Sequence, residues 1–115
     1  MKALIVEKPE RYSFINNIFK SIGVETTPIF KQGEVYDYVY IHYNGNFSLV
    51  DRIKGEQPNC ATIGYSSIPT RFAWTNSPNS EVERQMREHF DEIIYWNDSL
   101  DQVIETIRKI REPTE

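Results

Sequence analysis

Apolar and polar positions along the 115-residue chain repeat with the periods of strands and helices. Residues 3–6 form a short, wholly apolar run, which is typical of a buried strand. Pro9 then suits the first turn of a helix, and Gly23 suits its end. Between them, five apolar side chains recur on one helical face: Phe14, Ile15, Ile18, Phe19 and Ile22. The chain is therefore predicted to begin with a strand, a tight turn and a helix of about 14 residues.

Four more apolar runs predict four more strands, at residues 24–30, 36–43, 60–65 and 92–96. Pro28 cannot donate to a ladder, so the second strand is expected at an edge of the sheet. A short helix is predicted over residues 47–54, with Gly55 as its end. Because strands and helices alternate, we expect a five-stranded, mostly parallel sheet with helices on both faces.

Two helices near the C-terminus carry start signals. Residues 80–83 and residues 99–102 both have the pattern of a capping box, in which a serine and an acidic or amide side chain satisfy each other's backbone N–H groups. The helix after Ser80 is predicted to bury Val82, Met86 and Phe90. The helix after Ser99 is predicted to bury one stripe of side chains: Leu100, Val103, Ile104, Ile107 and Ile110.

The connection between the second and third strands is unusually short. Only residues 31–35 separate them, whereas parallel strands normally need a crossover of a dozen or more residues. We therefore expect the helix between these strands to be missing. Either the tyrosines of the third strand cover the exposed sheet face, or a partner chain covers it.

Composition narrows the class of protein. Hydrophobic residues make up 39% and charged residues 26%, which favours one folded domain over residues 1–115, with residues 112–115 as a frayed tail. The net charge of −4 argues against binding to nucleic acid or to an anionic membrane. The chain has neither an apolar run long enough to span a bilayer nor a signal-peptide pattern.

Cys60 is the single cysteine, which excludes an internal disulfide and a cysteine zinc site. A reducing cytoplasm is the simplest compartment, and Cys60 is expected to pack in the core. The glycines are scattered and form no phosphate-binding loop. We therefore predict no metal and no cofactor.

The carboxyl ends of parallel strands are where chemistry gathers in such a sheet. Glu7 and Lys8 follow the first strand, His42 ends the third, Ser66 ends the fourth and Trp96 ends the fifth.

The chain resembles the receiver domain of bacterial two-component response regulators over nearly its whole length. The resemblance rests on residues 3–7 before the helix at Pro9, on residues 36–41 as the third strand, on residues 91–95, and on a closing amphipathic helix from Ser99. It implies a flavodoxin-like α/β fold of three layers. It also implies phosphoryl transfer to an aspartate at the end of strand three, with an acidic pair that holds magnesium, a serine or threonine, and a lysine.

This sequence departs from that pattern at almost every position. Glu7 is the one acid left after the first strand, with Lys8 beside it. His42 stands at the aspartate position and Trp96 at the lysine position, whereas Ser66 matches. The resemblance therefore implies a pseudo-receiver whose phosphorylation pocket is vestigial. We expect no enzyme, but a stand-alone domain that acts in signalling by phosphorylation-independent contact with a protein partner or with a second copy of itself.

Some alternatives stay open at this stage. His42 is either a reactive or pH-sensitive group or a polar residue that closes a strand, and no carboxylate in the sequence obviously orients its ring. Lys8 either replaces the charge of the missing metal or lies in solvent. A different class of function is a small enzyme or ligand-binding protein that uses the strand-end pocket near Glu7, His42 and Ser66.

Two groups of aromatic residues are candidates for the contact surface. Tyr36, Tyr38 and Tyr40 are partly exposed if the helix over this face of the sheet is missing, and exposed tyrosines suit a protein interface. Alternatively, neighbouring loops cover these side chains. The second group lies in the long loop at residues 68–79 and has residue types that are enriched at binding hot spots: Arg71, Phe72 and Trp74.

Overall fold

A computed structural model describes residues 1–42, 47–66, 80–95 and 98–111, with the backbone alone for residues 80–83 and 111. The five strands are β1 (Lys2–Val6), β2 (Glu25–Thr27), β3 (Tyr38–His42), β4 (Ala61–Ser66) and β5 (Glu92–Tyr95). The four helices are α1 (Pro9–Ser21), α2 (Ser48–Glu56), α3 (Ser80–His89) and α4 (Leu100–Arg111). None of the described helices is long and apolar enough to cross a membrane.

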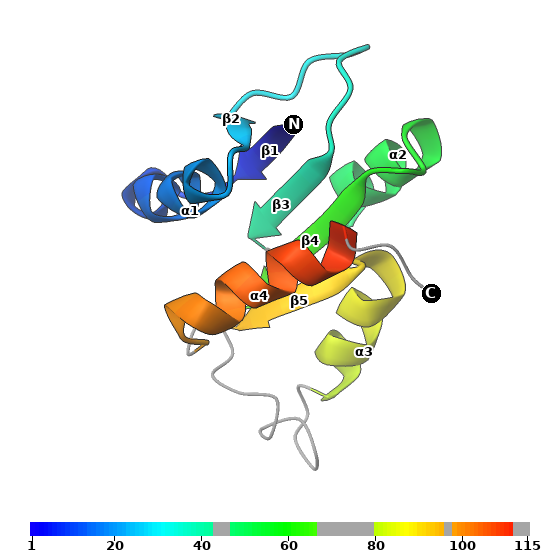
Figure 1. The fold of residues 1–115 in the computed structure, drawn as a ribbon. Coiled ribbons are helices and arrows are strands. Elements are labelled where there is room, and N and C mark those ends of the chain that lie inside the picture. Colours follow the sequence, from blue (N-terminus) through cyan, green and yellow to red (C-terminus); the bar gives the residue numbers. More distant parts are fainter. Residues whose placement is uncertain (43–46, 67–79, 96–97, 112–115) are drawn as a thin grey trace.

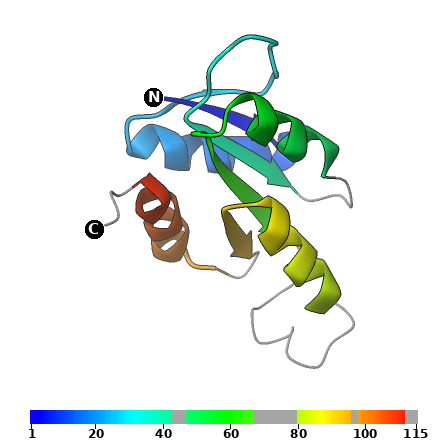
Figure 2. The ribbon, with the colours of Figure 1, turned by 90° about the vertical axis from the view of Figure 1, so that its right-hand side faces the viewer.

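The strands form one sheet in the order β2-β1-β3-β4-β5, and every neighbouring pair is parallel (Figure 1). Figure 2 shows α1 and α4 on one side of this sheet and α2 and α3 on the other. The predicted α/β sheet with two helical layers is therefore confirmed. β2 lies at an edge, as Pro28 predicted, but it ends at Thr27, before the proline.

Two of the predicted helix boundaries have their expected local structure. Gly23 has a φ of +81°, which costs glycine little, and its N–H bonds the carbonyl of Lys20 after the end of α1. At the start of α4, Ser99 Oγ accepts the N–H of Gln102, and Gln102 Oε1 accepts the N–H of Ser99. This reciprocal pair is the capping box that residues 99–102 predicted.

The predicted end of α2 at Gly55 is wrong. The helix continues through Glu56, and the N–H of Gln57 still bonds the carbonyl of Ile53 at 2.7 Å. Gly55 does not have a positive φ, so it acts here as an ordinary helical residue.

The predicted exposure of the tyrosines is also wrong. Tyr36, Tyr38 and Tyr40 are 2%, 3% and 0% exposed. Tyr38 and Tyr40 pack in the cluster beneath α1 and α4, together with Phe19 and Tyr65, so they do not face the side that lacks a helix. Tyr36 lies before β3 and packs in the cluster on the α2 side. All three are core residues in this fold and do not form an exposed contact surface.

The helix expected to be missing between β2 and β3 is absent, since none of the fully described residues 28–37 is helical. We call residues 28–37 the crossover segment. Phe30 and Tyr36 from this segment pack on the apolar cluster of the α2 side, which includes Leu4 and Val39. The crossover segment therefore supplies cover that a helix would otherwise provide.

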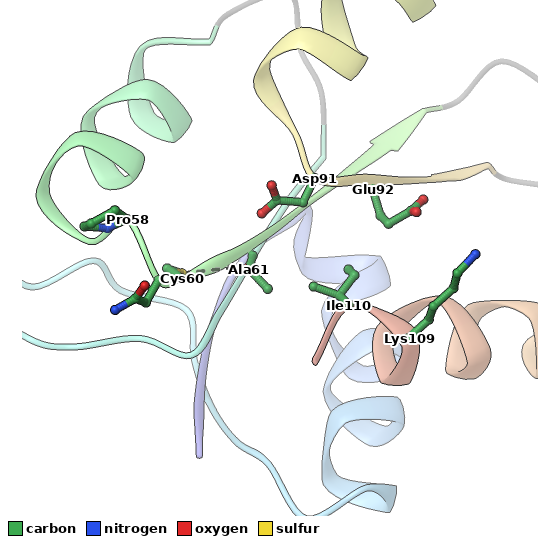
Figure 3. A pocket seen from close by; sticks show the side chains of 8 residues that line it. Pro58, Cys60, Ala61, Asp91, Glu92, Lys109 and Ile110 are labelled. Atoms are coloured by element: carbon green, nitrogen blue, oxygen red, sulfur yellow. Dashed lines mark hydrogen bonds between the residues drawn. The ribbon is translucent and has the colours of Figure 1, made fainter. Parts of the chain in front are cut away.

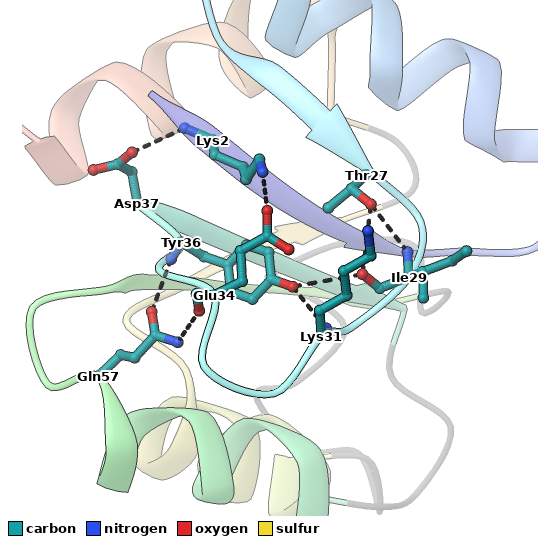
Figure 4. A network of polar contacts seen from close by, with 8 residues as sticks. All are labelled: Lys2, Thr27, Ile29, Lys31, Glu34, Tyr36, Asp37 and Gln57. Carbon is teal, nitrogen blue, oxygen red and sulfur yellow. Dashed lines mark hydrogen bonds and ion pairs between the residues drawn. The ribbon is translucent and has the colours of Figure 1, made fainter.

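Polar contacts hold the crossover segment in place (Figure 4). The side-chain amide of Gln57, just after α2, accepts the N–H of Tyr36 at 2.8 Å and donates to the carbonyl of Glu34 at 2.7 Å. Lys2 pairs with Glu34 from the β1 side, and the Tyr36 hydroxyl accepts the N–H of Lys31 at 2.9 Å. Gln57 thus satisfies two backbone groups that neither a helix nor a strand pairs.

We expect Gln57→Ala to lower the free energy of unfolding by about 1–3 kcal/mol, because it leaves a partly buried N–H and a carbonyl without their partner. Urea denaturation measures the change. Gln32→Ala is the matched control, since Gln32 is exposed on the same segment and should change stability by less than about 0.5 kcal/mol. Equal effects of the two substitutions would show that Gln57 does not hold the segment.

Candidate functional site

The candidate site lies where β1 and β3 end side by side. Val6 pairs with Ile41 in the parallel register, so the next residues, Glu7 and His42, are neighbours although 35 positions separate them in the chain. Ser66 ends β4 and is 3% exposed. Trp96, the fifth residue predicted for this pocket, lies outside the described residues.

Glu7 is the centre of a polar network. Its side chain is fully buried. Oε1 accepts the N–H of Lys8 at 2.8 Å and lies 2.6 Å from Nδ1 of His42. Oε2 accepts the hydroxyl of Tyr40 at 3.1 Å and lies 3.5 Å from Nε of Arg11. Both carboxyl oxygens are therefore engaged by groups of the protein itself.

The protonation of Tyr40 follows from this environment. Burial raises the pKa of the Tyr40 phenol far above its ordinary value, and the negative charge of Glu7 raises it further. The hydroxyl therefore keeps its proton at neutral pH and acts as a donor to Glu7. A carboxylate can only accept, so a hydrogen bond from His42 to ionised Glu7 requires the proton on Nδ1.

Arg11 of α1 and Tyr65 of β4 also contact this network. The guanidinium carbon of Arg11 lies 4.4 Å from the centre of the Tyr65 ring, within the range of a cation–π contact. The His42 ring meets Tyr65 edge-on at 4.9 Å between centroids. Burial raises the pKa of the Tyr65 phenol, and the charge of Arg11 opposes that rise.

The sequence predicted that Glu7, Lys8 and His42 lie at the carboxyl ends of the strands. It did not assign Arg11, Tyr40 or Tyr65 to this site. The expectation that no carboxylate orients His42 is wrong, since Glu7 does so. Lys8 is exposed, and the cation close to the Glu7 carboxylate is Arg11 instead. Two spacings were available as signals: Arg11 follows Glu7 by four positions on a helix start, and Tyr40 shares a strand face with His42.

The residues present do not fit the magnesium ion that a working receiver pocket would hold. Magnesium needs free carboxylate oxygens in near-octahedral geometry. Glu7 has already committed both of its oxygens, and Arg11 places a positive charge beside them. Among the described residues, no three His, Cys, Asp or Glu side chains are grouped as metal ligands.

Cavities lie at both ends of the parallel strands. One of about 480 Å³ opens at the amino ends of β4 and β5, between Cys60, Asp91 and Lys109 (Figure 3). There the Asp91 carboxylate accepts the N–H and the hydroxyl of Thr62, which joins the two strands rather than reaching for a ligand. A smaller cavity of about 200 Å³ lies between α1, β5 and α4, and Arg11 and Tyr65 of the polar network line it.

Solved structures with the same fold include several response regulators. The orphan response regulator HP1043 of H. pylori is 20% identical, with a TM-score of 0.69 over 97% of each chain. A response regulator from Thermotoga maritima is 17% identical, with a TM-score of 0.68 over 95% of each chain. NtrX from Brucella abortus, in complex with ADP, is 18% identical with a TM-score of 0.72, and the matched region covers 95% of this chain and 26% of NtrX.

No protein-family model matches the chain, and no curated protein sequence matches it. At identities of 20% and below, the structural likeness establishes the fold. The chain therefore has the α/β, flavodoxin-like fold of response-regulator receiver domains, as its sequence predicted.

Proposed function

We propose that this chain is a pseudo-receiver, a receiver-like signalling domain that acts by contact with a protein partner and without phosphorylation. The observation that carries the proposal is the buried Glu7, with its oxygens held by Tyr40, His42 and the backbone of Lys8. Aspartyl phosphorylation needs an aspartate at the end of the third strand and free acidic oxygens for a metal. This site has His42 and a saturated carboxylate instead.

The polar network gives the proposal a physical basis. A receiver that switches must have two arrangements of its strand-end residues that a phosphoryl group can bias. Here Glu7, at the position of the acid, binds His42, at the position of the phosphoacceptor. Arg11 adds a positive charge beside them. We propose that the domain is thereby held in one arrangement and catalyses no reaction. The lone, buried Cys60 accords with a cytoplasmic location.

The contact surface that we propose is the region of β5 and α4, together with residues 68–79. β5 is the second edge of the sheet, and Leu100 at the start of α4 is 51% exposed. An open groove of about 480 Å³ runs between β5 and α4. Arg71, Phe72 and Trp74 lie outside the described residues, so their part in this surface remains a prediction. Tyr36, Tyr38 and Tyr40 do not belong to this surface, because they are buried.

A second copy of the chain was one candidate for the partner, because a sheet face was expected to be bare. The crossover segment covers that face, so this reason for a homodimer no longer holds. A homodimer through β5 and α4 is still compatible with the proposed surface.

Mass spectrometry under native conditions tests the proposal. We expect no added phosphoryl mass after incubation with magnesium and acetyl phosphate. The reason is that His42 replaces the aspartate that would accept the phosphoryl group, and no group of metal ligands is found among the described residues. A response-regulator receiver domain treated in parallel shows that the donor is active. A stoichiometric adduct that maps to His42 would overturn the proposal. The same spectra report the oligomeric state, and a dimer that Leu100→Glu converts to a monomer would place a second copy on α4.

A further inference from the structure

The cavity of about 200 Å³ between α1, β5 and α4 has features that the proposed function does not use. Three aliphatic side chains line it, and all three are buried: Ile15, Ile94 and Val103 are 2%, 2% and 4% exposed. Phe14 also lines it and is 49% exposed. One part of the lining is therefore apolar, and Arg11, Tyr65, Tyr95 and Asp98 supply the rest.

Arg11 brings hydrogen-bond donors to the apolar part of this lining. Its Nε is buried and makes no hydrogen bond within the described part of the chain, although Glu7 Oε2 lies 3.5 Å away. Glu7 offsets part of the charge of Arg11, but its oxygens already serve Tyr40 and His42. A guanidinium has five N–H donors, and a buried donor without an acceptor is costly. An acceptor oxygen from outside the chain would complete it.

We infer that this cavity binds a small monocarboxylate with an apolar body, its carboxylate on Arg11 and its body among Ile15, Ile94 and Val103. A planar guanidinium matches a carboxylate in a two-bond fork. Asp98 lines the same cavity, and its negative charge opposes any carboxylate there, so a monocarboxylate meets less repulsion than a dicarboxylate. Cavities of roughly 150 Å³ hold benzene, so the body is about the size of one six-membered ring.

This inference goes beyond the proposed function and does not depend on it. Protein contact through β5 and α4 needs no ligand in this cavity, and ligand binding needs no partner. Failure of one therefore leaves the other intact, and separate measurements report on each.

A titration of the full chain with benzoate, followed by two-dimensional NMR of backbone amides, tests the inference. We expect a Kd of about 1 mM or tighter, with shifts confined to the residues that line the cavity. Benzamide has the same shape without the charge, and succinate adds a second carboxylate. Both should bind at least about tenfold more weakly: benzamide loses the hydrogen bond between charged groups, which is worth about that factor or more, and Asp98 repels the second carboxylate of succinate.

Three variants locate the site. Arg11→Gln should weaken benzoate about tenfold or more, because it removes the charged fork. Val103→Phe should abolish binding by filling the cavity, which gives a second test if Arg11→Gln disturbs the fold. Arg52→Gln is the matched control, since Arg52 stacks on Phe30 at 5.2 Å, away from the cavity, and should leave benzoate binding unchanged. Absence of shifts at about 10 mM benzoate, or equal binding of benzamide, would overturn the inference.

Discussion

Replacing Glu7 with alanine is expected to lower the free energy of unfolding by about 2–5 kcal/mol. The substitution leaves the Tyr40 hydroxyl and Nδ1 of His42 without an acceptor, and each such buried group costs about 1–3 kcal/mol. The pairing with Arg11 adds little to this figure, because the Arg11 side chain is 36% exposed and solvent screens its charge. Urea denaturation monitored by tyrosine and tryptophan fluorescence measures the loss.

Glu10→Ala is the control for Glu7→Ala. Glu10 is exposed in the first turn of α1, so its removal should cost less than about 1 kcal/mol, mostly through the helix dipole. Tyr40→Phe removes one of the donors to Glu7 and should fall between the two. If Glu7→Ala is no more destabilising than Glu10→Ala, the network is not a structural lock and the basis of the pseudo-receiver proposal fails.

The second large effect is expected at Gly64, in the central part of β4. A Cβ at this position would lie 2.6 Å from the Phe90 ring, and real Cβ atoms do not approach so closely. Phe90 is 3% exposed and follows α3 directly, so it cannot move without shifting α3 or β5. We expect Gly64→Ala to cost about 3 kcal/mol through overpacking.

Two further variants make the Gly64 prediction specific. Gly64→Ala combined with Phe90→Leu should be more stable than the sum of the single effects predicts, because the smaller side chain relieves the contact. Gly55→Ala should instead stabilise the protein by up to about 1 kcal/mol, since Gly55 lies inside α2 with open space around its Cα. Additive effects at residues 64 and 90 would contradict the close packing of β4 against Phe90.

Under the pseudo-receiver proposal, the network also explains how the strand ends are stabilised without a phosphorylation switch. A buried carboxylate without partners is costly, so Glu7 needs partners from the protein where no metal is held. His42 turns that liability into a hydrogen bond, with Tyr40 and Arg11 supplying the remaining partners. The same side chains therefore account for both the stability of the strand ends and the proposed absence of phosphorylation.

The sequence alone determined the order and type of the elements. The apolar run at residues 3–6 and the helical stripe after Pro9 are local patterns, and local patterns set secondary structure. Pro28 predicted the edge position of β2, although the strand ends at Thr27 and does not include the proline. The end of α1 at Gly23 and the start of α4 at Ser99 were equally readable, because each depends on neighbours within a few positions.

The tertiary structure alone decided which face each strand presents and what meets at the strand ends. Alternation along β3 shows that Tyr38 and Tyr40 share a face, but it does not say which helices cover that face. The bond between Glu7 and His42 joins residues 35 positions apart, so no local pattern encodes it. Only the parallel register of β1 and β3 brings the two side chains together and makes them one site.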